Sequence, residues 1–172
     1  LKKVTDTNVY EAAVARVNYT LDNFEKVYVS FSGGKDSTTM LHIVGQIARE
    51  RERTFGILVI DLEAQYKLTM QHVSDMLDEY ADVGEPFWIC LPMLLRNAVS
   101  QYEPRWCCWE PEKRDAWVRD LPNHKGVISD YDYFPFFVPR MEFEEFMVLF
   151  GLWYGDGHDA AAFVGIRAEE SL

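Results

Sequence analysis

Short continuous runs of apolar residues alternate along the chain with stretches in which apolar positions recur every three or four residues. The continuous runs predict buried strands, and the periodic stretches predict amphipathic helices. The first helix begins near Tyr10, and Thr7 is its expected N-cap. Strands are predicted at 25–31, 55–63, 87–91 and 161–166, and helices at 10–21, 40–48, 66–80 and 143–150.

Strands that alternate with helices and are apolar throughout are typical of a parallel sheet covered on both faces. The predicted fold class is therefore α/β, a three-layer α/β/α arrangement of the Rossmann-like type. Segment 92–139 breaks the pattern, with six prolines, many aromatic residues and no clear period. We expect it to form an insertion or lid over the carboxyl ends of the strands, where open α/β sheets bind ligands.

The 172 residues suit one domain, 1–172, and the absence of an initiator Met together with an abrupt end suggests a fragment of a longer polypeptide. A net charge of −11 argues against a broad nucleic-acid surface, although a local basic pocket stays open. The sequence contains no run of about 18 apolar residues and no secretory leader pattern. Three cysteines, an odd number, fit a reducing compartment, so a cytoplasmic protein without a membrane span is expected.

The stretch SGGKDS, Ser32 to Ser37, stands between the first strand and the second helix. Glycines allow a close backbone approach, and the first N–H groups of a helix suit an anion. Lys35 adds a positive charge, and the serines add hydroxyl donors. The alternative is a tight turn capped by Asp36 or Ser37. The lysine directly follows the two glycines, so the stretch fits neither the Walker A pattern nor the dinucleotide fingerprint.

SGGKDS resembles the PP-loop of the N-type ATP pyrophosphatases and of the phosphoadenylyl-sulfate (PAPS) reductases. VGIRAEES, Val164 to Ser171, is similar to the GxRxxES segment of the PAPS reductase family. VIDLEAQY and WEPEKRDAWVRDLP are similar to a narrower branch, the PAPS-reductase-like proteins that carry the DUF3440 region and include the immunoglobulin-binding regulator A type. The resemblance implies an adenine nucleotide alpha hydrolase-like domain.

The resemblance also implies the site. Lys35, Asp36 and Arg167 would act in catalysis, Asp36 would help to hold Mg²⁺, and Asp61 would contact the adenosine. For Asp61 a helix-capping or surface role is the alternative. Glu169 and Glu170 would either orient Arg167 or be solvated. The nucleotide-binding residues implied are Ser30, Ser32, Gly33, Gly34, Lys35, Asp36, Ser37, Thr38, Asp61, Gly165 and Arg167.

The expected ligand is ATP, or a PAPS-like nucleotide, and the expected reaction is cleavage of ATP at the α-phosphate to AMP and pyrophosphate, which activates an unidentified substrate. One alternative is a sulfonucleotide reductase whose cysteine lies outside these residues. Another is a nucleotide-binding regulatory subunit without turnover, working with a ParB-like partner. A homo-oligomer is also open.

Other candidate chemistry is weaker. Lys113, Arg114 and Arg119 could bind a second substrate, but ion pairs with neighbouring acids are the preferred interpretation. Cys90, Cys107 and Cys108 are interpreted as structural, and no iron–sulfur cluster is expected because C-x-x-C spacing is absent. Trp106 or Trp109 could stack on a base, although packing is the more common role of tryptophan. The four histidines have no partner at metal-ligand spacing.

Overall fold

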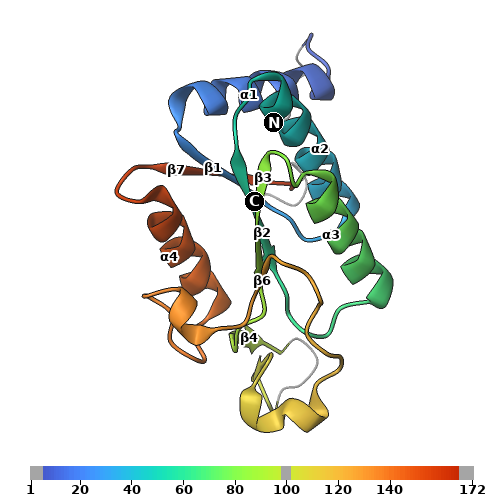
Figure 1. The fold of residues 1–172 in the computed structure, drawn as a ribbon, viewed down its shortest axis with the longest axis vertical. Helices are drawn as coiled ribbons and strands as arrows, with labels where there is room; N and C mark the ends of the chain where they lie inside the picture. The colour runs from blue at the N-terminus through green and yellow to red at the C-terminus, as the bar shows by residue number, and fades with distance from the viewer. Residues whose placement is uncertain (1–5, 98–101, 167–172) are drawn as a thin grey trace.

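The computed structural model describes residues 6–97 and 102–166, and within them the predicted strand and helix alternation is present (Figure 1). Three strands and three helices form the first half of the chain. A second part, 94–133, holds short strands and two 3₁₀ helices. The elements are α1 (Val9–Asn23), β1 (Lys26–Ser30), α2 (Lys35–Glu50), β2 (Phe55–Ile60), α3 (Lys67–Glu79), β3 (Gly84–Ile89), β4 (Leu94–Arg96), β5 (Arg105–Cys107), η1 (Pro111–Ala116), β6 (Val127–Ile128), η2 (Tyr131–Tyr133), α4 (Phe143–Gly155) and β7 (Ala160–Val164).

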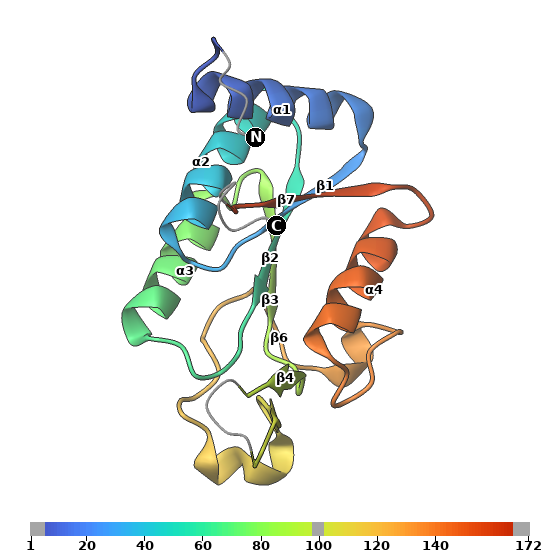
Figure 2. The same ribbon diagram turned by 180° about the vertical axis from the view of Figure 1, so that it is seen from behind.

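The main sheet has five strands in the order β6-β3-β2-β1-β7, and every neighbouring pair is parallel. Helices α2 and α3 lie on one face of the sheet and α4 lies on the other, while α1 packs against α2 (Figures 1 and 2). The predicted three-layer α/β/α fold is therefore confirmed. Its strands read as continuous apolar runs because both faces are covered.

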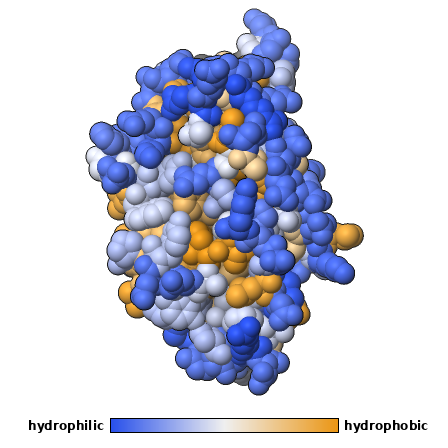
Figure 3. All heavy atoms as spheres, viewed as in Figure 1, coloured by the Kyte–Doolittle hydropathy of each residue, from blue (hydrophilic) through white to orange (hydrophobic). Residues whose placement is uncertain are grey.

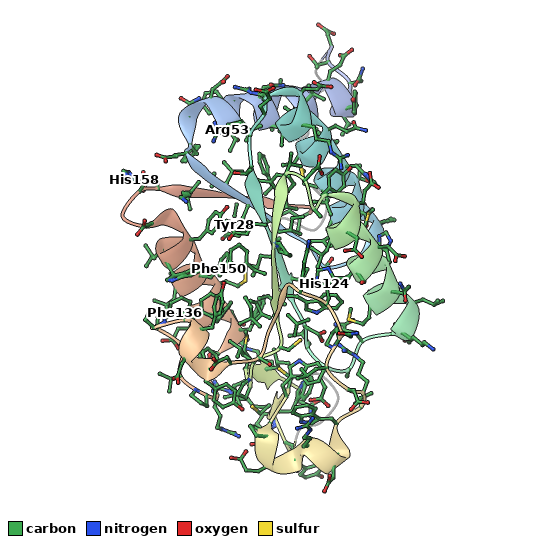
Figure 4. The ribbon with its side chains drawn as sticks, viewed as in Figure 1. Tyr28, Arg53, His124, Phe136, Phe150 and His158 are labelled. Carbon is green, nitrogen blue, oxygen red and sulfur yellow. The ribbon has the colours of Figure 1, made fainter. Side chains whose placement is uncertain are left out.

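Aromatic side chains fill the layer between the sheet and α4. The ring of Phe150 on α4 lies 5.2 Å from that of Tyr28 on β1 and 5.4 Å from that of Phe87 on β3, both in edge-to-face geometry (Figure 4). Such pairs add about 0.5–1.5 kcal/mol each to the area that they bury. The alternate residues of β1, Val27 and Val29, are also buried, and side chains alternate between the two faces of a strand. Both faces of β1 are therefore core.

Two details differ from the prediction. Asn8, not Thr7, caps α1, because the Asn8 side chain accepts a hydrogen bond from the N–H of Glu11 at 2.9 Å. Segment 92–139 is only partly an insertion, because it contains β6, which pairs with β3 of the main sheet. There the N–H of Cys90 donates to the carbonyl of Ile128 at 2.9 Å.

The surface in the view of Figure 1 is mostly hydrophilic, with a smaller apolar area near the middle of this face (Figure 3). Among the described residues no helix is long and apolar enough to cross a bilayer.

Candidate functional site

The glycine loop lies where the connections of the sheet change direction. From β1 the chain proceeds outward through β2, β3 and β6, whereas β7 is added on the opposite side of β1. Ser30 at the end of β1 pairs in register with Val164 at the end of β7. The loop after β1 and the segment after β7 therefore leave the sheet side by side. A crevice at such a switch point is the usual ligand site of an open α/β sheet.

Hydrogen bonds within the loop fix its shape. The Ser37 hydroxyl is buried; it lies 3.0 Å from the Gly34 carbonyl, to which it donates, and 3.0 Å from the Ser32 hydroxyl. The Ser37 hydroxyl also accepts from the Ser32 N–H at 3.3 Å. The side chain of Ser37 thus holds the loop together, and the exposed Ser32 is the serine that faces solvent.

Glycine is required at position 33. Gly33 has φ +75°, and a Cβ there would lie 2.9 Å from the Thr69 methyl and 3.0 Å from a Val73 methyl on α3. Gly34 is the N-cap of α2 and makes no side-chain capping bond. The first N–H groups of a helix have no partner inside the helix. The loop therefore presents the positive end of α2 at the carboxyl end of β1.

Lys35 and Asp36 are the charged residues of the loop. Lys35 Nζ lies 2.8 Å from Asp36 Oδ2, and their side chains are 75% and 35% exposed. Both can thus reach a ligand above the loop. The described residues hold no cluster of three His, Cys, Asp or Glu side chains suited to a metal ion. A Mg²⁺ ion that takes its other ligands from phosphate and water needs only one or two protein carboxylates, so the metal role of Asp36 stays a prediction.

Gly165 brings the segment after β7 against the loop. A Cβ at this position would lie 2.8 Å from the Asp36 carbonyl carbon and 2.8 Å from the Ser37 nitrogen and Cα. Only glycine allows this backbone approach. Arg167 was predicted to clamp a phosphate, and it lies outside the described residues, as do Glu169 and Glu170.

Thr38 connects the loop to α3. Its hydroxyl lies 2.9 Å from the Gly34 carbonyl and 2.9 Å from His72 Nε2. His72 has a partner that its sequence position did not indicate, because the two residues stand 34 positions apart. The bond couples the first turn of α2 to α3.

Asp61 does not have the geometry predicted for it. Its side chain is fully buried and pairs with Arg119, and it also accepts a hydrogen bond from Trp88 Nε1 at 2.9 Å. The N–H of Glu63 donates to the other carboxylate oxygen at 2.9 Å. A direct contact with adenosine does not fit this arrangement, and neither does a surface acid. The residue instead joins β2, β3 and the segment after η1.

Glu63 was predicted only as the end of a strand, yet it fastens the segment 94–133 to the sheet. It is buried with φ 64°, a backbone region that non-glycine residues seldom adopt. Its carboxylate accepts from the N–H of Trp109 at 2.7 Å and of Val118 at 3.0 Å. An acid at the end of an apolar strand gives no sign that it turns inward, so the sequence could not identify this role.

Lys113 and Arg119, two of the three residues of the basic cluster, make different contacts in the structure. Lys113 pairs with Glu110 at 2.6 Å, as preferred from the sequence, whereas Arg119 pairs with Asp61 and lies 4.9 Å from the ring centre of Trp109. Trp109 is buried, and its indole N–H donates to the Asp61 carbonyl at 2.7 Å. Packing is thus the role of Trp109.

The three thiols are free, and Cys90 and Cys108 are buried. Burial raises the pKa of Cys108 to about 12, and it also raises the pKa of Cys90 and of Cys107. A thiol with a raised pKa is a poor nucleophile at neutral pH, which agrees with structural roles.

Comparison with known proteins gives one match of note. The chain is 44% identical over 165 residues to an uncharacterized protein of Escherichia coli strain K12, YbdN. The match covers 95% of this chain and 40% of that protein, so the chain spans less than half of the relative's length. No family model and no solved structure matches the chain.

Proposed function

We propose that this domain binds an adenine nucleotide at the glycine loop and cleaves ATP at the α-phosphate, releasing pyrophosphate and activating a second substrate. The observation that carries the proposal is the close approach of the loop after β1 and the segment after β7 at the switch point of the sheet. There the Gly165 backbone packs against the first turn of α2, which also carries Lys35. Their chemistry suits a phosphate chain.

Each group has a distinct part in the proposed reaction. The N–H groups of the first turn of α2 bind phosphate oxygens, and Lys35 neutralises charge that develops on the departing pyrophosphate. Asp36 would contribute one oxygen ligand to Mg²⁺, which would supply positive charge beside the phosphates. Arg167, implied by the family resemblance, would supply a further cation. Catalysis rests on positioning and on charge, with no protein nucleophile.

Lys35 Nζ lies 2.8 Å from Asp36 Oδ2. A bound phosphate would offer Lys35 a partner with more negative charge than Asp36. The Asp36 carboxylate would then be available to Mg²⁺. Lys35 would then contact the phosphate, and Asp36 would bind the metal.

The test is pyrophosphate release from ATP with Mg²⁺, together with equilibrium binding of ATP, using the longest available polypeptide that contains this domain. Lys35→Ala should weaken ATP binding and abolish turnover. The matched control is Lys125→Ala, an exposed lysine on the segment before β6 that should change neither.

The other outcomes identify the alternatives. Binding without turnover, even beside a ParB-like partner, would indicate a regulatory subunit. Thiol-dependent release of sulfite from PAPS would indicate a sulfonucleotide reductase, with its cysteine elsewhere in the polypeptide. Failure to bind any adenine nucleotide would refute the proposal.

A further inference from the structure

A cleft lies beside α3, on the face of the helix next to the one that meets the glycine loop. It has a volume of about 560 Å³ and is bounded by α3, by segment 118–124 and by Trp88 of β3. That volume is in the range of small-molecule sites.

The helix α3 separates the two sites. Thr69 and Val73 face Gly33 of the loop, at the distances that a Cβ on Gly33 would meet. Met70 and Ser74, the next residues along α3, line the cleft. Because successive helical residues are turned by about 100°, the two pairs lie on adjacent faces of the same helix. The cleft can therefore hold one molecule while the glycine loop holds another.

The walls suit a flat ring with polar edges. Met70 and Pro122 offer apolar surface above the buried Trp88. Gln71 and Asn123 supply amides that both donate and accept, and Gln71 Nε2 also donates to Asp75 at 2.8 Å. Amide side chains of this kind read the donor and acceptor edge of a nucleobase. Apolar side chains pack on its faces.

The charges of the cleft nearly cancel. Arg119 is already paired with Asp61, and Lys67 and Asp120 carry opposite charges. A strongly anionic ligand therefore gains little here, in contrast to the glycine loop. The lining favours an uncharged ring.

Two cleft-lining side chains also have unused donors. His124 Nδ1 accepts from the N–H of Gly126 at 3.0 Å, which leaves the ring proton on Nε2. Within the described residues, His124 Nε2 and Arg119 Nε are buried without a hydrogen-bond partner. The nearest acidic oxygen to Nε2 is Asp78 Oδ1, at 3.5 Å. Figure 4 shows His124 between the sheet and α3.

We propose that this cleft binds a second ligand, an uncharged heteroaromatic ring of the nucleobase type, separately from the phosphate ligand of the glycine loop. The ring stacks between the Met70 and Pro122 walls, and the amides of Gln71 and Asn123 read its edge. The inference goes beyond the nucleotide site and does not require that the loop turns over ATP.

The experiment uses uridine, cytidine, adenosine and guanosine, which carry no phosphate. Each is titrated into protein with labelled methionine methyl groups, and the Met70 signal is followed by NMR. At least one nucleoside should shift this signal saturably. Ser74→Trp fills the cleft from α3 and should abolish the shift, whereas Gln46→Trp, on the exposed side of α2, should leave it unchanged.

Asn123→Ala is a second variant, at an exposed position that leaves the core intact, and it should weaken binding about tenfold. No shift with any of the four nucleosides would overturn the inference, as would unchanged binding in Ser74→Trp. Competition between the nucleoside and ATP would overturn the separation of the two sites. Nucleoside binding in a protein that does not bind ATP would instead support this inference while refuting the proposed function.

Discussion

Gly165→Ala tests whether the segment after β7 forms one wall of the phosphate site. The added Cβ would lie 2.8 Å from backbone atoms of Asp36 and Ser37, whereas ordinary contact begins at 3.4 Å. Backbone atoms of a helix cannot rotate away as the end of a side chain can. The two segments must therefore move apart by several tenths of an ångström.

The free-energy cost of the added methyl group at position 165 can be estimated from the range measured for substitutions that add carbon to a protein core. Forcing one extra carbon into a well-packed site costs about 1–3 kcal/mol. If binding requires the two segments to return to their close approach, the dissociation constant for ATP should rise about 5-fold to 140-fold, since about 1.4 kcal/mol is a factor of ten. Otherwise the cost should appear as a lower free energy of unfolding.

Two measurements separate these results: titration calorimetry with ATP, and urea denaturation. The control is Gly151→Ala on α4, where the new Cβ would meet nothing closer than the Tyr28 hydroxyl at 3.6 Å. It should leave ATP binding unchanged and stabilise the helix by about 1 kcal/mol. If Gly165→Ala binds ATP as tightly as the parent and unfolds at the same urea concentration, the argument from close approach is refuted.

Three further results are expected. Asp61→Asn leaves Arg119 without its buried counter-charge, so the free energy of unfolding in urea should decrease by about 3–5 kcal/mol. A decrease smaller than about 1 kcal/mol would contradict the buried pairing. Burial raises the pKa of Cys108 to about 12, so a thiol reagent at pH 8 should modify it far more slowly in the native protein than in urea; equal rates would argue against burial. Burial also raises the pKa of Tyr154 to about 12, while an unfolded tyrosine ionises near about 10. Stability should therefore be lost as the pH rises from about 10 to 12. Tyr154→Phe should lose less over that range, and an identical loss would exclude Tyr154 as a cause.

The parts that the sequence predicted well are those whose cause is local. The strands β1, β2 and β3 each contain a continuous apolar run, and the loop at Gly33 and Gly34 carries its own conformational signal. Covering both faces of a parallel sheet requires such runs, so the fold class follows from them.

The parts that it missed depend on partners distant in the chain. Asp61 turns inward because Arg119, 58 positions later, meets it there. Glu63 turns inward for a similar reason, since Trp109 and Val118 supply the N–H groups that it accepts. β6 has two residues, too few for any period, and only its pairing with β3 defines it.

The two edges of the main sheet are unequal, and this bears on assembly. At one edge β6 offers two residues, which is too short a template for another strand. At the other edge β7 presents five residues, Ala160–Val164, that include no charged side chain and no proline. Charged residues and prolines are what usually discourage strand addition at an edge. If a further strand joins this sheet, from the same polypeptide or from another molecule, the β7 edge therefore offers it the longer template. This edge is the one next to β1, from which the glycine loop starts.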